Sequence, residues 1–167
     1  EYPGLFGVVS GTVTGVTVDV STYSRGVGTV RAGGIAGRLL AGGVIENCFV
    51  SGRMESQATG GDGGIVGFLD GGMVKNCIVT ASMIDNGLSG GVCGFAAQQK
   101  SSGSISGCAV LSKQIDGYVI NREGLTTNIT KDGCFAWNGV ELMYANSGFQ
   151  GIPTKSVGEL QTAAAWP

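Results

Sequence analysis

The five cysteines are the side chains with the greatest chemical potential in this chain, because the sequence contains no histidine. Zinc sites commonly draw cysteine or histidine ligands from closely spaced pairs, and no two of these cysteines are closely spaced. A cysteine or serine nucleophile needs a base, and without histidine the usual dyads and triads are unavailable. The sequence therefore predicts no catalytic residue, no metal-binding residue, and neither a cofactor nor a cofactor-binding residue.

Carboxylates are the next candidates, since hydrolase or lyase chemistry on a β-rich scaffold needs acidic groups gathered at one place. Asp62 and Asp70 stand beside glycine in turn-like segments, where aspartate commonly bonds its own backbone. We therefore expect a structural role for both. Glycine-rich phosphate loops are also excluded, because no glycine cluster leads into a helical pattern or ends in lysine followed by serine or threonine.

Charge and hydropathy narrow the classes of partner. Ten basic and twelve acidic residues form no run of either sign, so neither nucleic acid nor an anionic membrane surface is favoured. No stretch reaches the roughly 20 apolar residues that span a bilayer, so membrane insertion of this segment is not expected. The first five residues, EYPGL, lack the features of a signal peptide. We expect a fragment of a larger exported protein.

An internal repeat supplies the elements that would position these side chains. The segments GGIAG at 33–37, GGIVG at 63–67 and GGVCG at 90–94 are each followed by a similar hexamer, as is GLFG at 4–7. The fourth positions of the hexamers, Val16, Cys48, Cys77 and Cys108, lie 32, 29 and 31 residues apart, and a weaker fifth copy contains Cys134. A period of this length is typical of a solenoid, propeller or array.

The hexamers themselves predict a bend between short strands. Their first, fourth and sixth positions are apolar, whereas a plain strand would place the first and fourth on opposite faces. The third position holds the residues that best tolerate a left-handed backbone, namely Gly15, Asn47, Asn76 and Gly107. A one-residue corner there lets both flanking strands face a common interior.

These features predict an all-β fold, a right-handed parallel β-helix of about five coils with a short C-terminal helix. One domain fills residues 1–167, with coils near 3–27, 28–62, 63–88, 89–117 and 118–140 and a cap over 141–167. A propeller blade needs four antiparallel strands and about forty residues, and ankyrin-type helices are incompatible with so much glycine and valine. In the fifth copy, Tyr118 to Lys131 lacks the glycine motif, which leaves the path of the last coil open.

Stacking of the coils about 4.8 Å apart predicts ladders of equivalent residues. One contains Leu5, Ile35, Ile65 and Val92, and another contains Val16 and the four repeat cysteines. The cysteines are expected to be buried free thiols, because stacked Cβ atoms lie farther apart than the roughly 3.5–4.5 Å of a disulfide. Outside the core, Glu46 aligns with Lys75 as an ion pair, and Asp19 aligns with Ser51, Thr80 and Leu111 without a second acid.

At the C-terminus, Ser156 and Glu159 form a capping-box pattern for a short helix. Val157, Leu160, Ala164 and Ala165 would give that helix an apolar face. Such a helix would cover the open strand edges at this end of the β-helix.

The glycine segments, together with VIENCFVSG and MVKNCIVTA behind two of them, resemble the GLUG-motif repeats of bacterial surface proteins. The closing segments GCFAWNGVEL and PTKSVGELQTAAAW resemble the ends of such arrays. The resemblance covers roughly residues 3–166 and carries over no catalytic residue. It implies a secreted or cell-surface protein whose repeats form a β-helical stalk or adhesin-like region, sometimes attached to immunoglobulin-cleaving metallopeptidases.

Three functions remain open at this point. The first is a non-catalytic bacterial cell-surface module, either an adhesin-like binding module or a rigid spacer. The others are a carbohydrate-active β-helix enzyme and the stalk of a surface protease. The expected partners are a host glycan or protein, or neighbouring domains of the same chain. The aromatic residues Tyr23, Trp137 and Tyr144 are candidates for an exposed surface.

Overall fold

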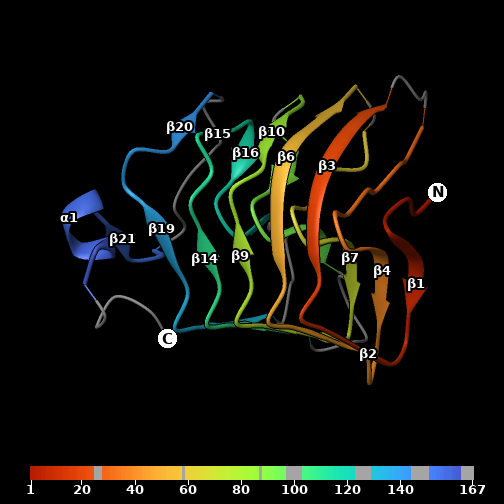
Figure 1. Ribbon diagram of the computed structural model, residues 1–167. Coiled ribbons are helices and arrows are strands. Elements are labelled where there is room, and N and C mark those ends of the chain that lie inside the picture. The colour runs from red at the N-terminus through yellow and green to blue at the C-terminus, as the bar shows by residue number, and fades with distance from the viewer. Residues whose placement is uncertain are drawn as a thin grey trace.

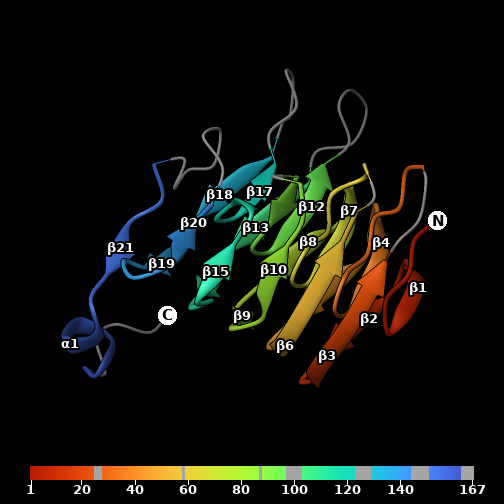
Figure 2. The same cartoon turned by 90° about the horizontal axis from the view of Figure 1, so that it is seen from above.

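The computed structural model is a parallel β-solenoid of about four turns with one short helix at its C-terminal end (Figure 1). It describes residues 1–24, 28–57, 59–86, 88–96, 103–122, 129–143 and 151–162. The coils stack in chain order from β1 at one end to β21 and α1 at the other, which is clearest from above (Figure 2). The predicted all-β fold and parallel β-helix are confirmed.

Three walls enclose the interior, and every pairing between the named strands is parallel. The motif wall follows the glycine motifs and contains β1 (Phe6–Val9), β4 (Ala36–Leu40), β7 (Val66–Asp70), β12 (Cys93–Ala96) and β17 (Asn121–Arg122). The second wall contains β2 (Thr12–Thr14), β5 (Val44–Glu46), β8 (Met73–Lys75), β13 (Ser104–Ser106) and β18 (Thr130–Asp132). These two walls have five strands each, one from each coil, and about four turns of the chain separate the first strand of a wall from its fifth.

The third wall is the longest. Its first two strands are β3 (Thr17–Ser24) and β6 (Phe49–Ser56), which pair over eight residues. Later coils break the same path into two shorter strands, namely β9 (Ile78–Val79), β10 (Ser82–Ile84), β14 (Ala109–Val110), β15 (Gln114–Ile115), β19 (Phe135–Trp137) and β20 (Glu141–Leu142). Strands β11 (Ser89–Gly90) and β16 (Gly117–Tyr118) form a separate two-stranded sheet. In the chain, β11 follows β10 and β16 follows β15.

The interior consists of the expected ladders. Ile35, Ile65 and Val92 are fully buried, and the cysteine ladder stacks in register because Phe49, the residue after Cys48, pairs with Ile78. Leu5 departs from the prediction, since its side chain is 56% exposed. It lies in the first coil, where no described strand stacks on the outer side of β1, so only one neighbouring coil covers it.

The predicted one-residue corner between the second and third walls is confirmed in all five coils. Asn47 and Asn76 have φ of 55° and 53°, and the equivalent glycines have φ between 58° and 68°. Those glycines are Gly15, Gly107 and Gly133. A left-handed residue at this position reverses the alternation of side chains, so the apolar positions before and after it both face inward.

The glycine motif needs glycine for a different reason from the corner, because the glycines of the motif do not have positive φ. In the 63–67 copy, a Cβ on Gly63 would come 2.5 Å from the backbone nitrogen of Gly94 in the next coil. A Cβ on Gly64 would come 2.5 Å from Cγ1 of Val79 on the opposite wall, and one on Gly67 would come 2.5 Å from the carbonyl carbon of Arg31. All three glycines are therefore required by lack of space.

The fifth coil completes the motif wall without a glycine motif. Val119 and Ile120 are fully buried, and the backbone N–H of Val92 donates to the carbonyl of Ile120 at 2.9 Å. Ile120 thus continues the ladder of Ile65 and Val92. The segment 123–128 of this coil lies outside the described residues.

Beyond the coils, β21 (Thr154–Lys155) pairs with β19 and continues the third wall. Helix α1 (Val157–Leu160) begins at Ser156 with the predicted capping box to Glu159. The predicted apolar face is wrong for Val157, which is 55% exposed, because α1 follows β21 beyond the core and buries none of its residues. Ala164 and Ala165 lie outside the described residues. No helix in the described parts of the chain is long and apolar enough to cross a membrane.

Candidate functional site

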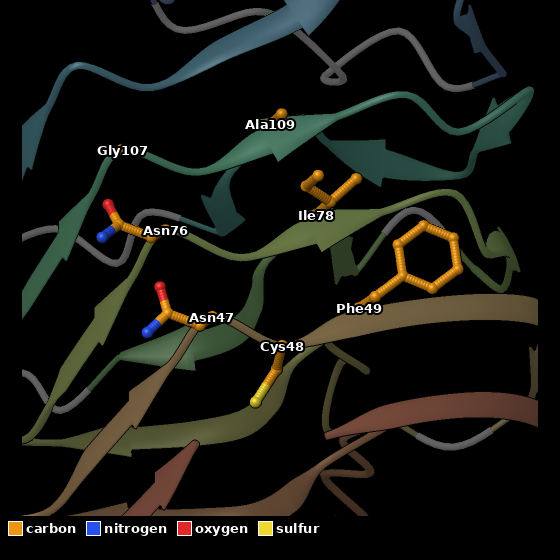
Figure 3. Close-up of a pocket in the computed structure, with 7 residues that line it drawn as sticks. All are labelled: Asn47, Cys48, Phe49, Asn76, Ile78, Gly107 and Ala109. Carbon is orange, nitrogen blue, oxygen red and sulfur yellow. The ribbon is translucent and has the colours of Figure 1, made fainter. Parts of the chain in front are cut away.

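A groove of about 380 Å³ opens where the corner meets the third wall (Figure 3). Its floor consists of outward-facing residues from three adjacent coils, Phe49, Ile78 and Ala109, each of which begins a strand of this wall. These residues stack in register, and the next position in the ladder is Phe135. Phe49 and Ile78 are half-buried on this floor, whereas Ala109 is almost fully covered.

The rim of the groove is polar and comes from the corner itself. Asn47 and Asn76 line it with Gly107, and in Figure 3 the two side-chain amides lie one above the other on the same side. Both residues are exposed, and their left-handed backbone fixes where their side chains leave the corner. Each amide has two N–H donors and one acceptor oxygen, so the rim can both donate hydrogen bonds to ligand hydroxyl groups and accept hydrogen bonds from them. An apolar floor beside a polar rim can bind a sugar ring, whose face carries C–H groups and whose edge carries hydroxyl groups.

Cys48 also lines the groove, but its chemistry is that of a packing residue. Its thiol is buried and donates to the Glu46 carbonyl at 3.2 Å, and burial raises its pKa. Burial likewise raises the pKa of Cys93 to about 12. All five cysteines are buried and free, as the sequence predicted. Protonated, enclosed thiols such as those of Cys48 and Cys93 are poor nucleophiles. The hydrogen bond with Cys108 instead lowers the pKa of Cys134 to about 7 and lowers that of Cys77, but both of these thiols are buried and neither lines the groove.

Polar residues that align between neighbouring coils are in contact, and they include the predicted ion pair of Glu46 with Lys75. Lys75 Nζ lies 2.8 Å from Glu46 Oε2, and the Ser51 hydroxyl donates to Asp19 at 2.9 Å. Asp70 forms a structural contact between coils: its carboxylate accepts from the Arg38 guanidinium of the preceding coil. The reason is that Leu40 and Asp70 are in register on β4 and β7, two residues beyond Arg38, within reach of its long side chain.

Asp62 also forms a structural contact with the preceding coil, and it lies inside the molecule. Only 2% of Asp62 is exposed, and its carboxylate accepts the Ala32 N–H of the preceding coil at 3.0 Å. Burial raises the pKa of Asp62 to about 6, and nearby Asp85 adds to the effect. Asp85 is itself buried and accepts from the Ser89 hydroxyl at 2.6 Å and the Leu88 N–H at 2.8 Å.

The pairing of Asp62 with Asp85 inside the molecule was missed from the sequence. The two residues belong to segments that no repeat position relates. The structure places them in polar contacts with neighbouring loops and not in the groove. Among the described residues, no three cysteine or acidic side chains are grouped so that they could hold a metal ion.

The three aromatic candidates are dispersed. Tyr23 is 53% exposed on β3 and borders a smaller pocket of about 180 Å³ with Glu55 and Asp85. Trp137 is half-buried on β19 beside Lys155, its partner in register. Tyr144 lies outside the described residues. The groove instead uses Phe49, whose place in the hexamer marks it as outward-facing.

Comparison with known proteins supports the repeat and the fold. Residues 28–53 match the GLUG motif. This match covers the second coil through Asn47, Cys48 and Phe49, so one face of the groove is built from the motif itself. The resemblance to GLUG-motif repeats inferred from the sequence is therefore confirmed over this segment.

Among solved structures, the chain is similar to a candidate immunoglobulin A1 protease from Bacteroides ovatus, with a TM-score of 0.66 and 20% sequence identity. The similarity covers 96% of this chain and 65% of that protein, so the chain corresponds to under two thirds of its length. At this identity the likeness concerns the fold alone. No curated protein matches the chain.

Proposed function

We propose that this chain is a non-catalytic β-helical module of a bacterial cell-surface protein, and that it binds a neutral saccharide in the groove at Phe49. The observation that carries the proposal is the groove of about 380 Å³ with an apolar floor and two side-chain amides on its rim. A pyranose presents C–H groups on its face and hydroxyl groups at its edge. It would pack on Phe49 and Ile78 while hydrogen bonding to Asn47 and Asn76.

The rigidity of the groove supports binding. Its residues come from three coils whose strands are held in register by backbone hydrogen bonds, such as Ile78 N–H to the Cys48 carbonyl at 2.9 Å and Ala109 N–H to the Cys77 carbonyl at 2.9 Å. Neither the floor nor the corner has to be ordered when a ligand arrives, which lowers the entropic cost of association.

The absence of an enzymatic role is part of the proposal. It is supported by the lack of histidine, by the raised pKa of Cys48 beside the groove, and by the structural contacts of Asp19, Asp62 and Asp70. None of these carboxylates lines the groove.

The proposed location on the cell surface rests on the GLUG motif at 28–53 and on the fold shared with the Bacteroides ovatus protein. The description of that protein as a candidate immunoglobulin A1 protease keeps a second role open, in which the module is the stalk of a protease. If the module is only a stalk, no saccharide is expected to bind in the groove.

Calorimetric titration of the purified chain with cellohexaose, xylohexaose and mannohexaose tests the binding role. We expect at least one of them to bind, and Phe49→Ala to weaken that binding about tenfold or more, which corresponds to about 1.4 kcal/mol. Asn76→Gly removes one amide and still permits the left-handed corner, so it isolates the hydrogen bonds. Phe6→Ala is the matched control, because Phe6 is 41% exposed on the motif wall.

Failure of all three saccharides to bind would reject the groove as a neutral-saccharide site. Equal loss in Phe49→Ala and Phe6→Ala would reject its location. Incubation with the same saccharides and with immunoglobulin A1 tests the enzymatic alternatives, and cleavage of any of them would overturn the non-catalytic proposal.

A further inference from the structure

The outer face of the motif wall carries a second feature, a row of aromatic rings with two arginines over it. Phe68 and Phe95 are in register on β7 and β12, and their ring centroids lie 5.9 Å apart. Tyr2 stacks on the other side of Phe68 at 5.9 Å with an interplanar angle of 13°. The row therefore runs from the segment before β1 to β12.

Each arginine lies over the junction between two neighbouring rings. The guanidinium carbon of Arg31 is 4.5 Å from the Phe68 centroid and 4.4 Å from that of Phe95. That of Arg38 is 5.4 Å from the Tyr2 centroid and 5.5 Å from that of Phe68. Cation–π contact of this kind fixes a guanidinium in place and shields one of its faces from water.

The two arginines differ in their charge partners. Arg38 forms an ion pair with Asp70. Arg31 has no carboxylate partner among the described residues, and its Nε is buried without a hydrogen-bond partner. Arg31 as a residue is half-buried. An unpaired cation held on aromatic rings is costly unless a ligand or solvent supplies the missing acceptors.

The glycine motif holds Arg31 in this position. The backbone of Arg31 crosses the next coil directly over Gly67, where any Cβ would come 2.5 Å from the Arg31 carbonyl carbon. The Arg31 N–H also donates to the Glu1 carbonyl at 3.1 Å. Backbone and side chain are thus both fixed before a ligand arrives, which reduces the cost of binding.

We propose that Arg31 is an anion-binding residue that takes the carboxylate of an acidic saccharide, such as a uronic acid unit, on the outer face of the motif wall. The guanidinium matches a carboxylate in a two-point contact. The neighbouring rings offer apolar surface to the sugar. A strongly acidic peptide is disfavoured, because the chain has a formal net charge of −2 and offers no broad positive field to attract many carboxylates.

This site is independent of the groove, which lies on the third wall. The two proposals can therefore be tested separately. We expect Phe49→Ala to leave binding at Arg31 unchanged, and we expect Arg31→Gln to leave binding in the groove unchanged.

The test uses the whole chain with three probes: trigalacturonic acid, the uncharged galactotriose, and triglutamate. We expect trigalacturonic acid to bind at least tenfold more tightly than galactotriose, and Arg31→Gln to remove that preference. Arg38→Gln is the matched control, because its charge is already engaged by Asp70, and it should change the affinity by less than threefold. Arg31→Lys keeps the charge without the planar fork and should weaken binding about threefold to tenfold.

A direct measurement keeps the proposal testable if Arg31→Gln does not fold. In the wild-type chain, the ¹⁵Nε resonance of Arg31 should shift on addition of trigalacturonic acid and not on addition of galactotriose. An unmoved Arg31 resonance, equal affinity for the charged and uncharged trisaccharides, or an unchanged affinity in Arg31→Gln would overturn the proposal. Tighter binding of triglutamate than of trigalacturonic acid would overturn the choice of a saccharide.

Discussion

Two corners of the solenoid are rich in glycine, and they need it for different reasons. At the corner between the second and third walls, Gly15, Gly107 and Gly133 have positive φ, and asparagine replaces glycine in the two coils between Gly15 and Gly107. At the glycine motif, φ is not positive, and a side chain is excluded because neighbouring backbone or the opposite wall occupies its space. Asparagine is tolerated in the first case and would be excluded in the second.

This difference explains why the corner accepts two residue types, whereas the three complete motifs keep glycine at the same three positions. A left-handed residue is a local requirement that asparagine can meet with its own backbone. Close packing of one coil on the next is a requirement set by several segments at once, and only the absence of a side chain meets it. The two corners should therefore respond differently to substitution.

The largest effect is expected at the motif. Gly63→Ala should lower the free energy of unfolding by about 3 kcal/mol or more, because the new methyl group would overlap the Val66 carbonyl and lie 2.5 Å from the Gly94 nitrogen. Urea denaturation followed by circular dichroism measures this. Gly11→Ala is the control, since a Cβ there meets nothing within 4 Å. Similar stability of both variants would contradict the steric explanation of the motif.

Asp62, directly before Gly63, should make stability depend on pH. Its folded-state pKa is raised from 3.8 to about 6, so the folded state holds this proton more tightly than the unfolded state. Its contribution is greatest below about pH 4 and is lost as pH rises to about 6, a change of about 1–3 kcal/mol.

Asp62→Asn should remove this part of the pH dependence and raise stability at pH 7, because a neutral amide oxygen still accepts the Ala32 N–H. Melting temperatures between pH 4 and pH 7 measure both effects. Asp19→Asn, at an exposed position, is the control. A wild-type chain and an Asp62→Asn variant with parallel pH profiles would refute the assignment.

A smaller effect is expected at the other corner. Asn76→Ala should cost about 1–2 kcal/mol, because alanine disfavours the φ of 53° found there. Asn76→Gly should cost little or nothing. Denaturation of the two variants under the same conditions compares them, and a larger loss for glycine than for alanine would mean that the amide, and not the backbone, stabilises the corner.

The smallest effect is expected in the cysteine ladder. Cys48→Val should change stability by less than about 1 kcal/mol, because the thiol acts as a small apolar group and Val16 already occupies the equivalent position in the first coil. Thermal denaturation measures the change. A loss above about 2 kcal/mol would indicate that the thiol contributes more than its volume.

Much of this architecture could be predicted from the repeat. The spacing of Val16 and Cys48 gave the register of the coils, and Asn47 gave the corner, because both depend on residues at fixed positions within one repeat. The exposure of Leu5 could not be predicted in the same way, since burial depends on whether a second coil covers the residue. The partners of Asp62 and Asp70 could not be predicted either, because Ala32 and Arg38 lie in the preceding coil.

The sequence by itself determined the β-helix, its ladders and its left-handed corners, because each follows from side-chain size, polarity and backbone preference repeated at one period. Only the tertiary structure decided which outward-facing residues form sites. The groove is formed where Phe49, Ile78 and Ala109 of successive coils stack beside Asn47 and Asn76. Arg31 reaches Phe68 and Phe95 because the segment before one motif crosses over the next coil. Such contacts join residues that no spacing within one repeat relates, so they depend on how separate coils lie against one another.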